Sequence, residues 1–298
     1  MEADRRRRSQ RSSGDEHIIG GLLCSPVGSG CIGCSSVQQM TTSDNYSRSV
    51  TGLVAIVTGA ASGMGEATAH VFAQAGARVA VTDLRLADAE TVANDIRHAG
   101  GDAVAWALDV ADLATVNAVV GQIAEHFGGI DILVNNAGIS VVCAIDDPTY
   151  EERWTTGVTV LLTAHQRMIR AALPHLRRSA SPRIVNIAST EALGATGGHS
   201  VYSAAKAGVT GLTRSLAVEL GRQGITVNCI CPGPINTAMT SPVPDEHKTI
   251  YAKRRTALGR YGSPYEVAHM TLSLCLPAAS FLTGVTIPVD GGLMARNA

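Results

Sequence analysis

Lysine is nearly absent from this chain. Among 298 residues there are three lysines, Lys206, Lys248 and Lys253, against 21 arginines. Generic positive charge is therefore supplied by arginine, which does not give up its proton at working pH, whereas lysine can. The first lysine, Lys206, follows Tyr202 by four residues, and this pair is the first candidate for proton chemistry.

Three further shortages exclude whole classes of protein. Aromatic residues make up 4% of the chain, so platforms for base stacking are not expected. The net charge of −1 gives no electrostatic reason to bind nucleic acid. No run of 18 apolar residues occurs, which predicts no membrane partner. What remains, 45% hydrophobic and 16% charged residues, is typical of a globular protein with a core.

The cysteines form no recognisable framework. There are seven, an odd number at irregular spacing, so no disulfide pattern is implied. Cys31 and Cys34 have the spacing of a metal pair but lack a second pair at zinc-site distance. We expect reduced thiols, a cytoplasmic location and no metal site.

Residues 1–50 differ in composition from the rest of the chain. They begin with Arg5–Arg8 and continue through Ser, Gly and polar residues without periodicity, which predicts a disordered tail. Met40 is an alternative start of translation. Residues 51–298 are expected to form a single folded domain.

A strand, a glycine loop and a helix open this domain. Leu53–Val57 is a short apolar run that suits a strand buried on both faces. Gly59, Gly63 and Gly65 follow, and then an amphipathic helix to about Ala75. Glycines there let the backbone approach a pyrophosphate, which rests on the helix amides. The order predicts a site for a dinucleotide.

The next expected strand, Arg78–Thr82, ends in Asp83. A carboxylate at that point can accept hydrogen bonds from both ribose hydroxyls of adenosine and repels a 2′-phosphate. The sequence therefore favours NAD as cofactor over NADP, although Arg85 keeps NADP open.

Strands and helices then continue to alternate. Helices are expected over about 86–98, 113–127, 150–176 and 202–222, and strands over about 103–107, 132–134, 183–188 and 225–230. This alternation predicts an α/β fold with a parallel sheet and helices on both faces. Ligand-binding residues then gather where strands end, which is where Gly59, Asp83, Asn135, Ser189 and Pro232 fall.

Tyr202 and Lys206 share one face if their segment is helical, with Cβ atoms about 5–6 Å apart. An ammonium on the next turn favours the phenolate, so we expect Lys206 to lower the pKa of Tyr202 and make a general acid/base. The alternative is a surface Tyr/Lys pair on an amphipathic helix.

Six motifs in this order resemble the short-chain dehydrogenase/reductase superfamily: Thr58-Gly59-x3-Gly63-x-Gly65, Asn135-Asn136-Ala137-Gly138, Ser189, Tyr202-x3-Lys206, Pro232-Gly233 and Asp290-Gly291-Gly292. The resemblance runs from about Gly52 to the C-terminus. It implies one Rossmann-type, doubly wound sheet of about seven strands and hydride transfer between a nicotinamide and a carbonyl or secondary alcohol. It also implies a homodimer or homotetramer.

The same resemblance implies residue roles. Tyr202 would exchange a proton with the substrate oxygen, Lys206 would lower its pKa and hold the nicotinamide ribose, and Ser189 would orient the substrate. Thr237 would bind the carboxamide. The expected cofactor-binding residues are Gly59, Ser62, Gly63, Met64, Gly65, Asp83, Leu84, Asp109, Val110, Asn136, Ala137, Gly138, Tyr202, Lys206, Pro232, Gly233, Ile235 and Thr237.

One position departs from the family pattern. An asparagine usually stands seven residues after the tryptophan that matches Trp154, and here that residue is Leu161. The family's asparagine helps to place a water that relays protons to the lysine, and a leucine side chain cannot hydrogen-bond. Backbone groups, Thr159 or Thr163 could substitute, or the relay is weakened.

The substrate is less well defined. Its walls should come from 140–146, 190–199 and a lid over 238–262 that contains a short helix, with Glu191 or His199 in reach of a polar group. The leading interpretation is an NAD-dependent alcohol or ketone oxidoreductase acting on a small molecule. The alternatives are a 3-oxoacyl-thioester reductase of the same family and a catalytically weak nucleotide-sensing protein.

Overall fold

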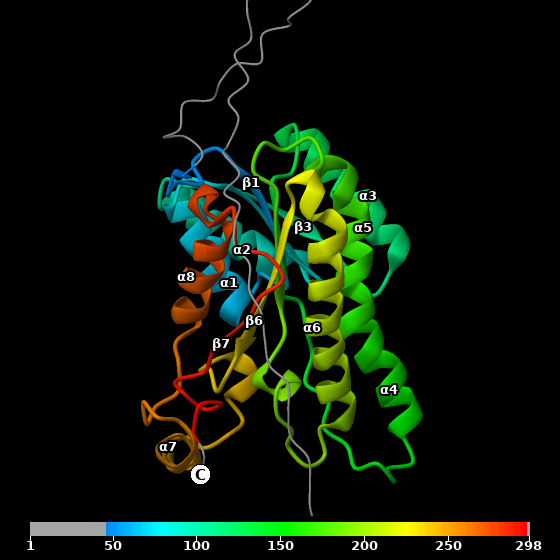
Figure 1. The fold of residues 1–298 in the computed structure, drawn as a ribbon, viewed down its shortest axis with the longest axis vertical. Helices are drawn as coiled ribbons and strands as arrows, with labels where there is room; N and C mark the ends of the chain where they lie inside the picture. The colour runs from blue at the N-terminus through cyan, green and yellow to red at the C-terminus, as the bar shows by residue number, and fades with distance from the viewer. Residues whose placement is uncertain (1–45, 297–298) are drawn as a thin grey trace, which may run out of the picture. The chain divides into compact units, whose positions relative to one another are not determined.

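The computed structural model describes residues 46–296, which contain a seven-stranded sheet whose strands all run parallel (Figure 1). The strands are β1 (Val54–Thr58), β2 (Arg78–Asp83), β3 (Asp102–Ala107), β4 (Ile132–Asn135), β5 (Arg183–Ile187), β6 (Thr226–Pro232) and β7 (Thr286–Val289). Their spatial order is β3-β2-β1-β4-β5-β6-β7. The predicted Rossmann-type, doubly wound sheet is confirmed.

The strand order reverses at β1, which pairs with β2 on one side and β4 on the other. Strands β1, β4, β5 and β6 are buried along their whole length, as their Val- and Ile-rich sequences require in a sheet covered on both faces. A crevice opens beyond the carboxyl ends of β1 and β4 because the chain leaves them toward opposite faces. The fold thus places the candidate site at this point.

Helices cover both faces of the sheet (Figure 1). One face carries α1 (Gly63–Gln74), α2 (Leu86–His98) and α8 (Pro264–Cys275), which share a core with β1 and β2 side chains such as Val57 and Val79. The other carries α3 (Leu113–Phe127), α5 (Ala164–Leu176) and α6 (Ser200–Leu220). Helices α4 (Tyr150–Val158) and α7 (Asp245–Arg255) complete the fold. None of the helices within 46–296 is long and apolar enough to cross a membrane.

The long helix expected over 150–176 is interrupted. Helix α4 passes into a π-helical segment, Thr159–Thr163, before α5 begins. The helical segment nevertheless covers the expected range, 150–176, and the π-helical turn within it was not predicted. A π turn contains an extra residue, so it rotates the side chains after it relative to those before it, and such turns are frequent at functional sites. Leu161 lies inside this segment.

Two further features concern the boundary of the domain and its thiols. The folded part includes Val50, which is fully buried, and Ser47, whose carbonyl accepts a hydrogen bond from the Ala278 amide. Residues 1–45 of the expected tail lie outside the described residues. Four cysteines within 46–296 are free thiols and buried, namely Cys143, Cys229, Cys231 and Cys275.

Candidate functional site

The glycine loop between β1 and α1 is tightly packed against its neighbours. A Cβ on Gly65 would lie 2.1 Å from the Gly59 carbonyl oxygen, and one on Gly59 would lie 2.8 Å from the Ala137 Cα. Gly59 and Gly63 also have φ values of 62° and 60°, which disfavour other residues. Ser62 precedes α1 without a side-chain cap, so the first amides of α1 are available to an anion.

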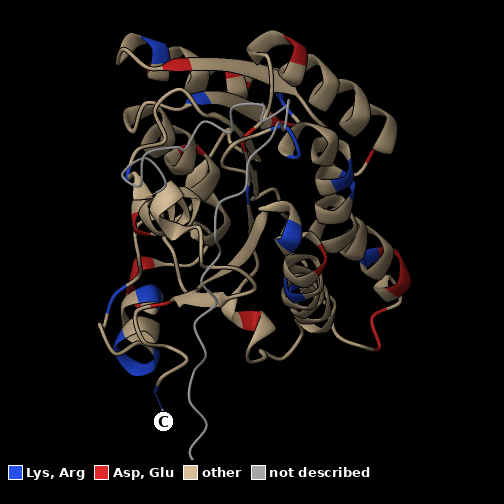
Figure 2. Cartoon of the chain, turned by 45° about the horizontal axis from the view of Figure 1, so that its top comes forward, with Lys and Arg blue, Asp and Glu red and all other residues tan. Residues whose placement is uncertain are grey.

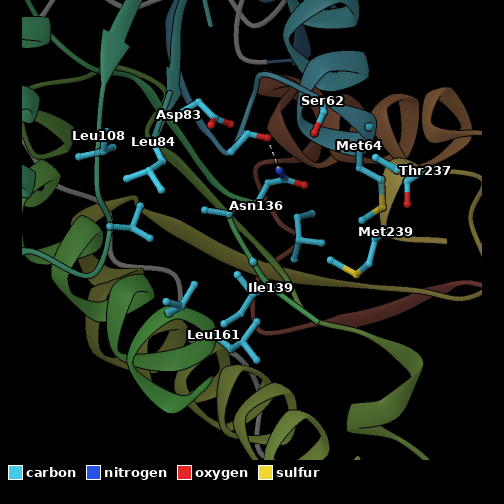
Figure 3. A pocket seen from close by; sticks show the side chains of 18 of the residues that line it. Ser62, Met64, Asp83, Leu84, Leu108, Asn136, Ile139, Leu161, Thr237 and Met239 are labelled. Atoms are coloured by element: carbon cyan, nitrogen blue, oxygen red, sulfur yellow. Dashed lines mark hydrogen bonds between the residues drawn. The ribbon is translucent and has the colours of Figure 1, made fainter. Parts of the chain in front are cut away.

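Thr58 joins the ends of β1 and β4. Its hydroxyl oxygen accepts hydrogen bonds from the Asn136 and Ala137 amides, each over 3.0 Å. In return, the Asn136 side chain donates to the Thr58 carbonyl over 2.9 Å. It also donates to the Gly59 carbonyl over 3.2 Å, which is the dashed line in Figure 3. The Asn136–Gly138 segment is thereby held beside the glycine loop.

Asp83 lies at the end of β2. Its carboxylate accepts hydrogen bonds from the Ala61 amide over 3.2 Å and the Arg85 amide over 3.3 Å. These contacts hold it at the cavity while leaving it half-exposed. The Arg85 guanidinium forms an ion pair with Asp88. Arg85, the basic residue that left NADP possible as the cofactor, is therefore paired with an acidic residue one turn along the same helix.

Tyr202 and Lys206 lie in the first turns of α6, as expected from their spacing. The Lys206 Nζ donates a hydrogen bond to the Ile187 carbonyl over 2.8 Å and lies 5.8 Å from the centre of the Tyr202 ring. Ser189, two residues beyond β5, accepts a hydrogen bond from the Glu191 amide through its side chain, which lies near enough to Tyr202 to act on the pKa of that phenol. The three predicted catalytic residues are brought together.

The expected lowering of the Tyr202 pKa by Lys206 is not found. Burial is the largest influence on the pKa of Tyr202 and raises it, the Ser189 hydrogen bond acts to lower it, and the Glu191 charge raises it further. Burial also lowers the pKa of Lys206 to about 8. Both shifts have the same cause, since a poorly hydrated site disfavours either charged form.

Glu191 organises the loop that follows Ser189. Burial acts to raise the pKa of its carboxyl group, but hydrogen bonds from Thr196 and Ser203 outweigh it and hold the pKa below its usual range. The carboxylate accepts from the Thr196 amide and hydroxyl and from the Ser203 hydroxyl. Its position thus fixes the loop against α6.

The glycine loop, Asp83, Tyr202 and Lys206 line one cavity of about 370 Å³. Asp83, Leu84 and Leu108 lie toward one end, and Ser62, Met64 and Thr237 toward the other, with Asn136 between them (Figure 3). The predicted residues that line it are Gly59, Ser62, Gly63, Met64, Asp83, Leu84, Asp109, Val110, Asn136, Ala137, Gly138, Tyr202, Lys206 and Thr237.

Five predicted site residues do not line this cavity: Gly65, Ser189, Pro232, Gly233 and Ile235. Gly65 and Gly233 have packing roles instead, since a Cβ on Gly233 would lie 2.7 Å from the Asp290 Cα. Other lining residues were not predicted as site residues, among them Ile139, Val160, Leu161, Ala188 and Met239. Leu161 had been singled out from the sequence only as a departure from the family pattern, and Met239 only as part of the expected lid, whereas Val160 and Ala188 are apolar and carry no local signal.

The site and fold define a class. The glycine loop has no room for a Cβ at Gly59 or Gly65, and with the free amides at the start of α1 it fits the phosphates of a dinucleotide. The Asp83 carboxylate at the end of β2 fits its ribose. This is a Rossmann-type dinucleotide-binding protein.

Comparison with known proteins gives the family. Residues 59–294 match the family model described as enoyl-(acyl carrier protein) reductase. A solved structure of a dehydrogenase/reductase from Sinorhizobium meliloti is 37% identical, covers 86% of this chain and 99% of its own, and has a TM-score of 0.79. The chain belongs to the short-chain dehydrogenase/reductase superfamily, which implies a nicotinamide cofactor.

Similar proteins with curated names act on varied substrates. The 2,5-dichloro-2,5-cyclohexadiene-1,4-diol dehydrogenase of Sphingobium indicum is 38% identical over 81% of this chain and 96% of its own. A 3-oxoacyl-[acyl-carrier-protein] reductase of Thermotoga maritima is 36% identical over 82% and 98%. The meso-2,3-butanediol dehydrogenase of Serratia marcescens is 37% identical over 82% and 95%. The chain is thus an oxidoreductase of this superfamily.

Proposed function

We propose that this protein transfers a hydride between NAD(H) and a small secondary alcohol or its ketone. The observation that carries the proposal is that Tyr202 and Lys206 line the same cavity as Gly59 and Asp83. A general acid/base and a dinucleotide cradle therefore share one space.

In this proposal Tyr202 exchanges a proton with the substrate oxygen, and Ser189 orients that oxygen. Its raised pKa keeps Tyr202 protonated at working pH, which is the form that can donate a proton to a carbonyl. Lys206, anchored on Ile187, presents its ammonium behind Tyr202. The bound nicotinamide supplies the hydride donor or acceptor. The glycine loop, Asp83 and Thr237 would hold the cofactor.

The preference for NAD over NADP rests on Asp83 and Arg85. The half-exposed Asp83 carboxylate repels a phosphate, and the Arg85 guanidinium that could bind one is paired with Asp88. We further propose that the protein is a homodimer or homotetramer that buries the outer face of α6, where Val218 is 85% exposed.

A second candidate is reduction of a 3-oxoacyl thioester. It is favoured by the similarity to 3-oxoacyl-[acyl-carrier-protein] reductases and by the basic last turn of α7, Lys253–Arg255, which could attract an anionic carrier. Elsewhere in residues 46–296, basic and acidic positions are interspersed over helices and loops (Figure 2). The basic turn is thus a local feature.

A screen of small secondary alcohols, diols and acetoacetyl thioesters, followed by NADH absorbance with NADP in parallel, tests both candidates. The expected result is turnover of an alcohol or diol with NAD that is lost in Tyr202→Phe. Turnover confined to thioesters would favour the second candidate. Full activity of Tyr202→Phe would overturn the mechanism, and nucleotide binding without any turnover would favour a sensing protein.

A further inference from the structure

His199 lies next to Tyr202 at the start of α6. It precedes the first helical residue as the N-cap, and its ring lies 6.3 Å from the Tyr202 ring, centre to centre, at an interplanar angle of 70°. Helical side chains lean toward the N-terminus of their helix, so the Tyr202 ring extends over the turn where His199 stands. This edge-on contact holds the imidazole beside the general acid/base of the proposed reaction.

His199, Tyr202 and Lys206 form a row along one face of α6. Their spacings of three and four residues place them on successive turns of that face. Lys206 is 3% exposed at the inner end of the row, whereas Tyr202 and His199 are half-buried. Tyr202 and Lys206 line the cofactor cavity, and His199, one turn further out, does not. A substrate that meets Tyr202 from outside the cofactor cavity therefore has His199 beside it.

The ring of His199 has unused hydrogen-bonding capacity. Its Nδ1 is buried and has no hydrogen-bond partner among the described residues. The backbone of His199 is nevertheless fixed, since its amide donates to the Thr196 carbonyl over 3.2 Å and its carbonyl accepts from the Ser203 amide over 2.7 Å. A buried polar atom without a partner calls for a water or a ligand. The fixed backbone keeps the imidazole in one place for it.

Glu191, the other polar residue expected near the substrate, is already engaged. Its carboxylate accepts hydrogen bonds from the Thr196 amide over 2.9 Å, from the Thr196 hydroxyl over 2.6 Å and from the Ser203 hydroxyl over 3.0 Å. A substrate hydroxyl would have to displace one of these donors. The structure thus separates the two candidates, because Glu191 holds the loop while the His199 ring is available to a ligand.

A mostly apolar segment packs against the turn that precedes His199. The Gly198 carbonyl accepts a hydrogen bond from the Cys143 amide over 2.9 Å, which brings the expected substrate wall, 140–146, to this turn. Val142 in that segment is exposed, and its Cγ1 would lie 3.7 Å from a Cβ on Gly198. Small-molecule sites are commonly apolar, with a few placed polar groups that orient the ligand. His199 has the position of such a group.

We propose that His199 is a specificity-determining residue that hydrogen-bonds a second oxygen of the substrate, on the carbon next to the one that reacts. The substrate class is then a vicinal diol, or the α-hydroxy ketone in the reverse direction. Side chains on one helix face lie about 5–6 Å apart at Cβ, so oxygens on adjacent carbons can reach both Tyr202 and His199. An imidazole has one donor and one acceptor nitrogen, which matches a hydroxyl group. This inference rests on the proposed function, since it assumes that the reacting oxygen meets Tyr202.

The test compares 2,3-butanediol with 3-methyl-2-butanol, which carries a methyl group in place of one hydroxyl and has nearly the same shape. Wild type should favour the diol in kcat/KM by about 10-fold or more, because the analogue leaves a polar group of the site unpaired. His199→Phe keeps an aromatic ring beside Tyr202 but removes its polar atoms, so this ratio should fall about 10-fold. NADH absorbance measures both substrates. General damage to the enzyme lowers both rates alike and leaves the ratio unchanged.

Two further variants separate recognition from packing. His199→Gln removes the ring but can still donate and accept a hydrogen bond, so it should keep most of the wild-type ratio. His98→Gln, at the exposed end of α2, is the control and should keep the full ratio.

The inference is overturned if His199→Phe keeps the wild-type ratio, if wild type does not distinguish the two alcohols, or if His199→Gln loses the ratio as fully as His199→Phe. The proposed function itself would be wrong if wild type oxidised neither alcohol or if Tyr202→Phe remained active.

Discussion

Lys206 is tied to the main chain of β5: its Nζ donates to the Ile187 carbonyl over 2.8 Å, across 19 residues of sequence. The acceptor is a backbone atom, so the anchor does not depend on which side chain stands at 187. Lys206 is 3% exposed, and this contact compensates in part for its burial. The position of the ammonium is set by the sheet rather than by its own helix.

Replacing Lys206 by Met should lower kcat by at least about 100-fold, because an acid/base group loses the cation that supports it. Arg should not restore activity, since a planar guanidinium does not fit a point-charge site. NADH absorbance measures both. Lys253→Met is the control, because Lys253 is exposed in the last turn of α7, and it should retain turnover. A Lys206→Met enzyme with near-wild-type kcat would contradict the assignment.

The lowered pKa of Lys206, about 8, predicts a dependence of stability on pH. Between pH 8 and the ordinary lysine value of 10.5 the unfolded chain binds the proton and the folded chain does not, so folding becomes more favourable as pH rises. The gain is on the order of 3 kcal/mol across this window. Urea unfolding of wild type and Lys206→Met at several pH values should show this rise in wild type alone. Equal slopes would exclude it.

Replacing Asp83 by Ala should lower the preference for NAD. Loss of a carboxylate that binds ribose hydroxyls and repels phosphate should reduce the ratio of kcat/KM for NAD to that for NADP about 10- to 100-fold, or about 1.4 to 2.8 kcal/mol. Asp95→Asn, on the exposed side of α2, is the matched control. An unchanged ratio in Asp83→Ala would mean that other residues select the cofactor.

Replacing Gly65 by Ala should disrupt the glycine loop. The new Cβ would lie 2.1 Å from the Gly59 carbonyl oxygen, a backbone atom that cannot move aside without displacing the loop. We expect a loss of more than about 3 kcal/mol or a failure to fold. Gly121→Ala in α3 has open space around the new Cβ and should stabilise by up to about 1 kcal/mol. Thermal unfolding compares them, and a Gly65→Ala protein as stable as wild type would refute the packing argument.

Elements with strong local signals could be predicted closely. The sequence predicts helix α3 over 113–127, where it is observed, because Asp112 caps its first amides and Gly128 ends it in a left-handed conformation. Helix α8 was missed although its signal is also local: Ser263 and Glu266 form a capping box with Pro264 at its start. The π-helical segment has no such signal, because the spacing of apolar residues does not distinguish a π-helical turn from an α-helical one.

The sequence by itself determined the order of the motifs, and hence the fold, the glycine cradle and the meeting of Ser189, Tyr202 and Lys206, because each depends on residues that strand ends and helix spacing bring together. Only the tertiary structure decided the direction in which the Tyr202 pKa shifts, the pairing of Arg85 with Asp88 and the burial of His165. The physical reason is that desolvation depends on what distant segments pack around a group, and no local pattern records it.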